Sequence, residues 1–565
     1  MRIPASSLSL GLGLLVGCAT PVPPSPAEAR TPAGAASCAY DSCDQALSNA
    51  EAVYADLNDA VSVLGAIDAG SIVTYRGKDR AAWANEKQRL EQRLATMVRS
   101  AQPGAHPANE RRVLGILQTK LAAFREDTSA AGESQARCAD ANRREASFQA
   151  LSAALVACFT EIGNSLEFEA SRLDRASALA KLHELEGAAR RRELFESFAP
   201  LWQAVNGTNG PESPYRRLIA LAARDARTNG KGSPIDAAAR TVGITGERLE
   251  QWLVEILEAW RIATQGSPVE PWDYRYAAGA ADRALAGKIS LDSMLDVDHR
   301  YYRDLGVDLD ALGVLYDLAP RAGKSSVAYT DFLVHGRMTS PARWSPTVAR
   351  VLATYRDGSL GSLNELVHEN GHAAHISAIR NRPVFVDWND DLFVEAFADV
   401  SSWSLYEPAW QRRYLDAEAP ERDSLRALFG GVMLDVAWAL FESRMLREPA
   451  TDPNALWTQI TSRYLHIAPH PELSWWAVRV QLVDMPGYMV NYGLGAVLTA
   501  DLRQRVRESI GPFDTGNARW YPWLSQQLLR FGSERDTPAL VSGFLGRPVS
   551  PEALLAQIRR IKARG

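Results

Sequence analysis

Apolar residues recur every three or four positions along most of this chain, and that spacing is typical of amphipathic helices. Residues 81–98 and 111–125 show the pattern clearly, with many arginine, glutamate and glutamine residues between the apolar ones. Turn-forming residues near 102–107 and 128–134 separate these helices from their neighbours. The pattern predicts a body built mainly from helices.

Strand signals are sparse and lie in the middle of the chain, most clearly at 314–318, 326–333 and 350–355. Three short runs so close together indicate one small β-sheet. We therefore predict a mainly α-helical fold whose small sheet comes just before the chemical motif described below.

The composition is that of a soluble globular protein, with 565 residues, of which 46% are hydrophobic and 23% are charged. These values exclude a disordered, collagen-like or polytopic membrane chain. The 62 basic and 67 acidic residues give a net charge of −5, so the charge balance indicates no nucleic-acid partner.

The N-terminus is predicted to be a signal peptide over residues 1–17, because its apolar run is too short to span a bilayer. The segment 15–18 (Leu-Val-Gly-Cys) resembles a bacterial lipobox. That resemblance implies that Cys18 carries the lipid anchor of a cell-envelope protein. Ala19, which follows, implies sorting to the outer membrane, facing the periplasm. A plain secretory signal is the alternative.

The mature chain is predicted to begin with a tether over residues 18–47, which is rich in proline and alanine. The body then spans 48–565 and divides into an N-terminal helical part, 48–205, and a catalytic part, 206–565. We make no prediction of its oligomeric state.

The other four cysteines are Cys38, Cys43, Cys138 and Cys158. An even number in an exported chain predicts two disulfides, and the spacing leaves three pairings open. All four lie far from the motif below, so we interpret them as structural.

The motif His-Glu-x-x-His begins at His368. His368 and His372 are four residues apart, so on a helix they share one face and can bind one zinc ion. Glu369 can hold a zinc-bound water and accept its proton as the general base.

A third ligand is predicted on the next helix, because a catalytic zinc has three protein ligands and one open position. Glu395 and Asp399 stand one turn apart in a segment that is otherwise nearly apolar. We expect Glu395 to be the ligand and Asp399 to accept a hydrogen bond from a ligating histidine. His375 would crowd the metal as a third ligand on one helix, so we expect it to support or pack against the site.

Further motifs accompany the zinc-binding segment, namely Pro271-Trp272-Asp273-Tyr274, Tyr302 with Leu305-Gly306, the block from Leu315 to Lys324, the helix from His368 to His375, and Phe393-Val394-Glu395. With these motifs, the sequence resembles the thimet oligopeptidase and oligoendopeptidase F family of zinc peptidases over about residues 270–495. The resemblance implies a two-lobed helical body with a deep substrate channel, one Zn²⁺ ion and short peptides as substrates. It also implies that the strand at 350–355 pairs with the substrate backbone. The segment 395–399 (Glu-Ala-Phe-Ala-Asp) is similar to the related angiotensin-converting enzyme group as well.

Downstream, the segment 484–493 resembles the family's Gly-Tyr-rich stretch, which implies that Tyr488 and Tyr492 donate hydrogen bonds to the oxyanion. The family's histidine before the first tyrosine is missing here. His466 or His470 could replace it from a loop.

The sequence leaves two alternatives to an oligopeptidase. One is a peptidyl dipeptidase of the angiotensin-converting type, which needs a cation for the free C-terminal carboxylate; Arg321, Lys324 and Arg479 are the candidates. The other is a non-catalytic, peptide-binding envelope lipoprotein on the same scaffold.

Overall fold

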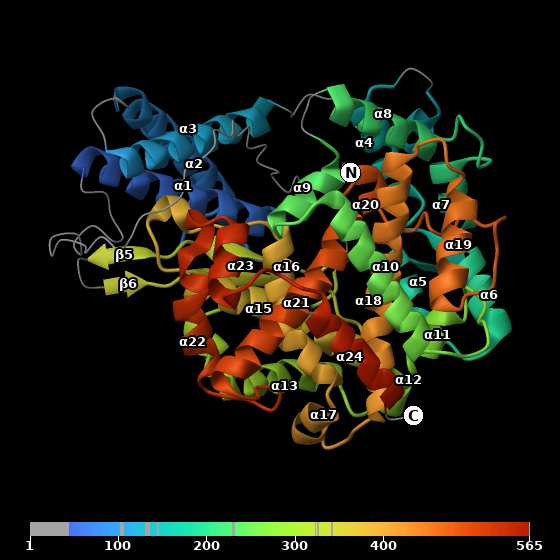
Figure 1. Ribbon diagram of the computed structural model, residues 1–565. Helices are drawn as coiled ribbons and strands as arrows, with labels where there is room; N and C mark the ends of the chain where they lie inside the picture. The colour runs from blue at the N-terminus through green and yellow to red at the C-terminus, as the bar shows by residue number, and fades with distance from the viewer. Residues whose placement is uncertain are drawn as a thin grey trace.

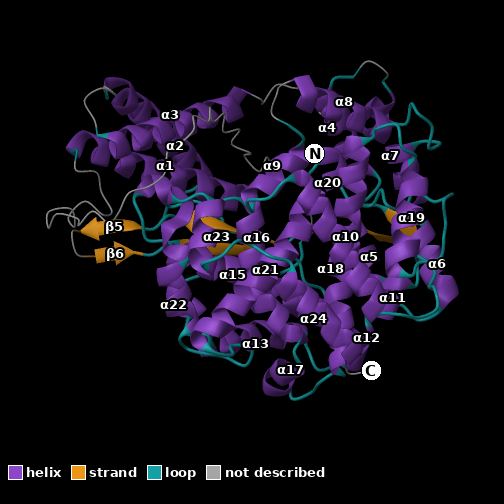
Figure 2. Ribbon diagram, in the orientation of Figure 1, coloured by secondary structure: helices purple, strands orange, loops and turns teal. Residues whose placement is uncertain are grey.

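The computed structural model confirms the predicted mainly helical fold, with about 65% helix and 6% strand (Figure 2). A first lobe at the upper left of Figure 1 contains the first three helices, and the later helices form the rest of the body. The structure describes residues 44–101, 107–129, 136–143, 146–228, 232–321, 324, 327–340 and 343–563.

The first lobe consists of α1 (Gln45–Asp68), α2 (Arg80–Ser100) and α3 (Ala108–Ser129). The helix α1 begins within the segment expected to be tether, because the side chain of Asp44 caps it by accepting the N–H groups of Ala46 and Leu47. The lobe has its own apolar core, which includes Tyr54, Leu57 and Leu94.

Most of the remaining helices share one large core that begins at Ala141, so packing divides the body earlier than the predicted boundary at 205. Before the sheet come η4 (Cys138–Asn142), α4 (Phe148–Glu161), α5 (Arg175–Lys181), α6 (Ala188–Glu196), α7 (Ala199–Asn206), α8 (Pro214–Thr228), α9 (Pro234–Thr241), α10 (Gly246–Ala263), α11 (Tyr274–Ala278), α12 (Ala280–Ala284), α13 (Leu291–Asp304) and α14 (Leu309–Leu312). After it come α15 (Leu360–Ala378), η5 (Pro383–Phe385), α16 (Asp391–Ser402), η6 (Trp403–Tyr406), α17 (Pro408–Leu415), α18 (Glu421–Arg447), α19 (Pro453–Leu465), α20 (Gln481–Asp484), α21 (Met489–Ile510), α22 (Trp520–Gln527), η7 (Leu529–Glu534), α23 (Thr537–Leu545) and α24 (Glu552–Ala563).

The predicted sheet is present and has three strands in the order β3 (Leu315–Asp317), β7 (Val348–Leu352), β4 (Tyr329–Val334). The central strand β7 runs parallel to β3 and antiparallel to β4. The expectation that this strand pairs with substrate is therefore wrong, because both of its edges already carry a neighbouring strand. Two further antiparallel pairs, which the sequence did not indicate, are β1 (Leu166–Phe168) with β2 (Ser171–Leu173) and β5 (Arg337–Ser340) with β6 (Arg343–Ser345).

The three-stranded sheet is covered on both faces. Phe332 and Val351 belong to an apolar cluster with Ala373 and Ile376 of α15. Alternate residues point the other way, and Leu333 joins the core of the first lobe. The sheet thus fixes α15 relative to the first lobe.

One of the predicted disulfides lies within the described residues, and it joins Cys138 to Cys158. Cys158 is on α4, which packs against α20 and whose Ser152 donates a hydrogen bond to the carbonyl of Val483 (2.8 Å). Cys18, Cys38 and Cys43 lie outside the described residues, so the predicted lipid anchor and second disulfide stay predictions.

Within the described residues, α18 is the one helix long and apolar enough to cross a membrane by length and composition. Its most apolar window is 67% buried inside the protein. Its apolar side chains, such as Trp438 and Phe441, belong to the large core, so we interpret α18 as a core helix.

Candidate metal centre

The motif helix α15 and the following α16 pack closely against each other. Gly371, inside the His-Glu-x-x-His motif, permits this approach: a Cβ there would lie 2.9 Å from the Cα and the carbonyl oxygen of Ala398. The motif glycine therefore brings Glu395 on α16 towards the two histidines on α15.

His368, His372 and Glu395 meet with their ligand atoms within 4.8 Å of one another. The two Nε2 atoms are 3.1 Å apart. The carboxylate oxygens of Glu395 lie 3.3 Å from Nε2 of His368 and 3.7 Å from Nε2 of His372. The structure thus brings together the three residues that the sequence proposed as ligands.

This donor set fits a zinc ion. Atoms bound tetrahedrally at 2.0–2.1 Å from one ion stand roughly 3.3–3.4 Å apart, which is close to the three separations above. Two imidazoles and one carboxylate also match the donors that catalytic zinc sites use, with the fourth position left open.

Asp399 lies where the sequence placed it, one turn after Glu395. Its Oδ1 atom is 2.8 Å from Nδ1 of His368, and it also accepts a hydrogen bond from the hydroxyl of Ser402 (3.0 Å). With Nδ1 held in this way, Nε2 of His368 points to the centre of the cluster. Burial opposes the charged form of His368, but the carboxylates of Asp399 and Glu395 outweigh it and raise the histidine's pKa well above its usual value.

Glu369 is buried on the same helix, with 5% of its surface exposed. Burial raises its pKa to about 7, in spite of the nearby His368 and a hydrogen bond from Thr330. The hydroxyl of Thr330 lies 2.6 Å from Oε2 of Glu369. A carboxyl group with a pKa near neutrality is suited to taking up and releasing a proton.

His375 is fully buried and faces the rings of Trp388, Phe393 and Phe397. Burial lowers its pKa to about 3, so the ring is neutral. Neither ring nitrogen has a hydrogen-bond partner among the described residues. This placement fits the packing role that the sequence suggested.

A pocket of about 490 Å³ lies beside the cluster. His368, Glu395, Tyr488 and Tyr492 all line it, so the predicted tyrosines do face the candidate site. The hydroxyl of Tyr492 accepts a hydrogen bond from Gln481 (3.0 Å). Burial, together with the nearby carboxylate of Asp391, raises the pKa of Tyr488, which therefore keeps its proton as a donor.

His466 and His470 do not reach this pocket. Nε2 of His466 lies 3.0 Å from the carbonyl oxygen of Arg261. His470 pairs with Glu270 and Glu472 at 2.7 and 2.6 Å. Neither histidine replaces the one that the family pattern leads us to expect.

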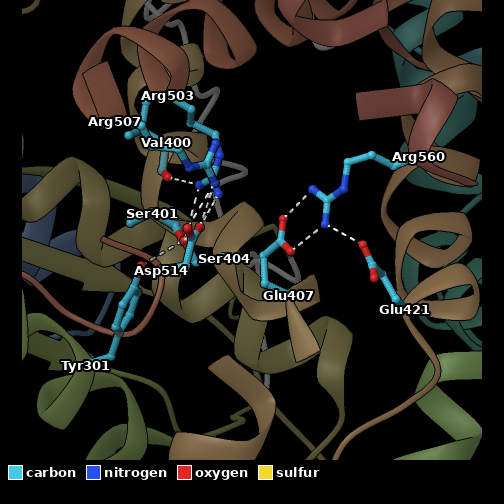
Figure 3. A network of polar contacts seen from close by, with 10 residues as sticks. All are labelled: Tyr301, Val400, Ser401, Ser404, Glu407, Glu421, Arg503, Arg507, Asp514 and Arg560. Atoms are coloured by element: carbon cyan, nitrogen blue, oxygen red, sulfur yellow. Dashed lines mark hydrogen bonds and ion pairs between the residues drawn. The ribbon is translucent and has the colours of Figure 1, made fainter. Parts of the chain in front are cut away.

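The far end of α16 is held by a separate polar network (Figure 3). Arg503 of α21 is buried, donates hydrogen bonds to the carbonyl of Val400 and the hydroxyl of Ser404, and pairs with Asp514 at 2.6 Å. Tyr301 of α13 donates a hydrogen bond to the carbonyl of Ser401 (3.3 Å). A cation at the C-terminal end of a helix is also favourable for the helix dipole, so this network fixes the helix that carries Glu395.

Sequence reasoning missed three residues of this region: Gly371, Thr330 and Asp391. The glycine was visible in the motif, but its use depends on where α16 packs. Thr330 lies 39 residues before Glu369 and meets it only through the fold.

Comparisons with known proteins show the fold. No family model matches the chain, and no curated protein matches it. Among solved structures, an M32 carboxypeptidase from Deinococcus radiodurans R1 is similar, with a TM-score of 0.50 and 14% identity. The match covers 91% of this chain and 97% of that one. The chain therefore has a helical fold like that of the M32 carboxypeptidase.

Proposed function

We propose that this protein is a zinc-dependent peptidase that hydrolyses short peptides. The observation that carries the proposal is the convergence of His368, His372 and Glu395 beside the buried acid Glu369. The fold likeness to a carboxypeptidase supports the same class of activity. The resemblance of the motifs to the thimet oligopeptidase family supports it from the sequence.

The chain's own residues have distinct roles in this proposal. His368, His372 and Glu395 hold the ion, and Asp399 orients the ring of His368. Zinc, when bound, supplies a Lewis acid for the attacking water and the scissile carbonyl. Glu369 accepts a proton from the water and passes it to the leaving amine. Tyr488 and Tyr492 provide O–H donors for the oxyanion.

The substrate backbone has a different strand to pair with than the sequence suggested. Among the described residues, β4 pairs with a strand on one side only, and its Thr330 contacts the general base. We therefore assign to β4 the strand-pairing role that the resemblance placed on residues 350–355.

The test is Glu369→Gln in a protein loaded with one zinc per chain. We expect zinc content and folding to stay the same while kcat falls roughly 100- to 10,000-fold. The exposed Glu212→Gln is the matched control. Full turnover by Glu369→Gln would refute the base assignment, and a wild-type chain without bound zinc or hydrolysis would favour a non-catalytic binding protein.

A second candidate function, release of residues from a free C-terminus, is supported by two neighbouring arginines that lie behind the residues lining the pocket. Arg479 pairs with Asp435 and lies over the ring of Tyr492 at 5.0 Å, and both of these partners line the pocket. Its Nε has no partner among the described residues. The pKa of Arg275 is lowered to about 10, mainly by burial and in second place by the positive charge of the neighbouring Arg479. Such an excess of guanidinium groups suits a carboxylate.

The other two candidate cations lie elsewhere. Arg321 and Lys324 both pair with Asp317, at 2.5 and 3.0 Å. Cleavage of one peptide, prepared with a free and with an amidated C-terminus, distinguishes a C-terminal peptidase from an oligopeptidase. A C-terminal peptidase loses most of its kcat/KM on amidation, and Arg479→Gln removes that preference; an oligopeptidase cleaves both forms alike.

We also propose that the protein is anchored in the bacterial cell envelope through a lipid on Cys18. The lipobox-like segment 15–18 supports this proposal. Metabolic labelling with a palmitate analogue should mark the wild-type chain and leave Cys18→Ser unlabelled. Equal labelling of both would contradict the anchor.

A further inference from the structure

Thr330 and Glu369 form a contact between the sheet and the motif helix that no motif predicts. The hydroxyl oxygen of Thr330 lies 2.6 Å from Oε2 of Glu369 and 2.9 Å from that residue's carbonyl oxygen. Both residues are buried. A hydroxyl has one proton to donate, and an ionised carboxylate is the stronger acceptor. The carbonyl lies inside α15, where the helix supplies its own N–H donor.

The strand that carries Thr330 is held firmly. Thr330 pairs with Val351 of β7. The next residue, Asp331, forms an ion pair with the buried Arg350, and Phe332 packs in the cluster that includes Ala373 of α15. A side chain on such an element keeps its position better than one on a loop.

The contact occupies only one oxygen of the carboxylate. Within the described part of the chain, Thr330 is the residue whose side chain gives Glu369 a hydrogen bond, and it does so at Oε2. The second oxygen, Oε1, is left for a water molecule. When one oxygen of a carboxylate is fixed, the orientation of its other oxygen is defined as well. Proton transfer to a base requires such a defined orientation.

We propose that Thr330 is a positioning residue that aims the carboxylate of Glu369 at the candidate metal centre. This inference rests on the proposed function, because it takes Glu369 to be the general base of a peptidase. It adds a residue outside the zinc motif and links the strand β4 directly to the chemistry.

The test compares Thr330→Val, which keeps a β-branched side chain without the hydroxyl, with Thr330→Ser, which keeps the hydroxyl. We expect Thr330→Val to bind one zinc per chain and to lower kcat roughly 10- to 100-fold with little change in KM. Thr330→Ser should recover most of the rate. A wild-type kcat in Thr330→Val, or an equal loss in Thr330→Ser, overturns the proposal.

A second measurement does not depend on turnover. Acetohydroxamate passes a proton to a neighbouring base when it binds a metal, so its affinity reports on Glu369. We expect Thr330→Val to weaken binding roughly tenfold by calorimetry, and to have no further effect when added to Glu369→Gln. The same tenfold loss in the Glu369→Gln background would show a structural role and overturn the proposal.

The two readouts also separate this inference from the proposed function. If the wild type binds zinc and acetohydroxamate but cleaves no peptide, the peptidase proposal fails. The acetohydroxamate affinities of the single and double variants still show whether Thr330 positions Glu369. A wild type that binds no zinc overturns both.

Discussion

The two ends of the same helix, α16, carry polar clusters of opposite character. At its C-terminal end, Arg503 is 1% exposed and pairs with Asp514, the carbonyl of Val400 and the hydroxyl of Ser404 (Figure 3). Near its beginning, Glu395 faces two imidazole nitrogens 3.1 Å apart, and Nδ1 of His372 has no partner among the described residues. The first cluster pairs its charges within the protein, although Nε of Arg503 has no hydrogen-bond partner among the described residues, whereas the second gathers possible metal ligands around a common point.

The difference separates structural from functional polar groups. Buried charges that find partners within the protein stabilise one arrangement of helices. Two imidazole nitrogens and a carboxylate that converge on one point are suited to an external ion. We therefore expect substitutions at the two ends of α16 to damage different properties, and the following measurements test this from the largest expected effect to the smallest.

The largest effect is expected for Glu395→Ala, which removes one of the three donors. Zinc affinity, measured by competition with a chelator, should fall by at least roughly 1,000-fold. The unfolding midpoint of the metal-free protein should hardly change, because half of this side chain is exposed. Tight zinc binding by this variant would contradict the role of Glu395 as a zinc ligand.

At the other end, Arg503→Met should lower the free energy of unfolding by about 3–5 kcal/mol, because Asp514 is left without one of its guanidinium partners. Denaturant titration measures this loss. Arg412→Met is the control, since its pair with Glu418 is exposed and should contribute less than about 1 kcal/mol. An equal effect of the two substitutions would show that the buried network contributes no more to the free energy of unfolding than an exposed ion pair does.

Glu442 is a buried acid with an intermediate character, because only one of its two carboxylate oxygens has a hydrogen-bond partner among the described residues. Its Oε2 accepts the N–H of Met489, the first residue of α21, whereas Oε1 has no partner among the described residues. Burial raises its pKa to about 8. The folded protein then holds this proton while the unfolded chain releases it, so the contribution to stability is complete below about pH 4 and is lost as the pH rises to about 8.

Glu442→Gln should therefore flatten the pH dependence of stability. Between pH 5 and 9 the wild type should lose about 2–4 kcal/mol more of its unfolding free energy than this variant does. Glu212→Gln, at an exposed position, should follow the wild type. Parallel curves for wild type and Glu442→Gln would show that this carboxyl is ionised in the folded protein.

The smallest effect is expected for Asp399→Asn, which keeps the size of the side chain and weakens its hold on Nδ1 of His368. Zinc affinity should fall roughly 10- to 100-fold, as is usual for a residue that orients a ligand. Asp416→Asn, on an exposed helix end, is the control. An unchanged affinity would remove Asp399 from the site.

The parts of the site that depend on local geometry were predictable from sequence. The spacing of His368 and His372 on a helix places them on one face, and Glu395 stood out as an acid among apolar neighbours. The three strands of the main sheet were also indicated by their residues.

The parts that depend on contacts between distant segments were not predictable. Strand order is set by packing, so nothing in residues 350–355 showed that β7 would lie in the centre of the sheet. The use of Gly371 depends on the position of Ala398, and the contact of Thr330 with Glu369 depends on the pairing of β4. His466 and His470 were plausible by distance along the chain, but their hydrogen bonds hold them elsewhere.

The bond between Cys138 and Cys158 has a practical consequence for anyone who produces this protein. It closes a loop onto α4, the helix against which α20 and the segment leading to Tyr488 rest. A chain made in a reducing cytosol would carry two free thiols there, and its support for that segment would come only from packing and the hydrogen bond of Ser152. Batches purified from different compartments should therefore be compared only after their thiol content has been titrated.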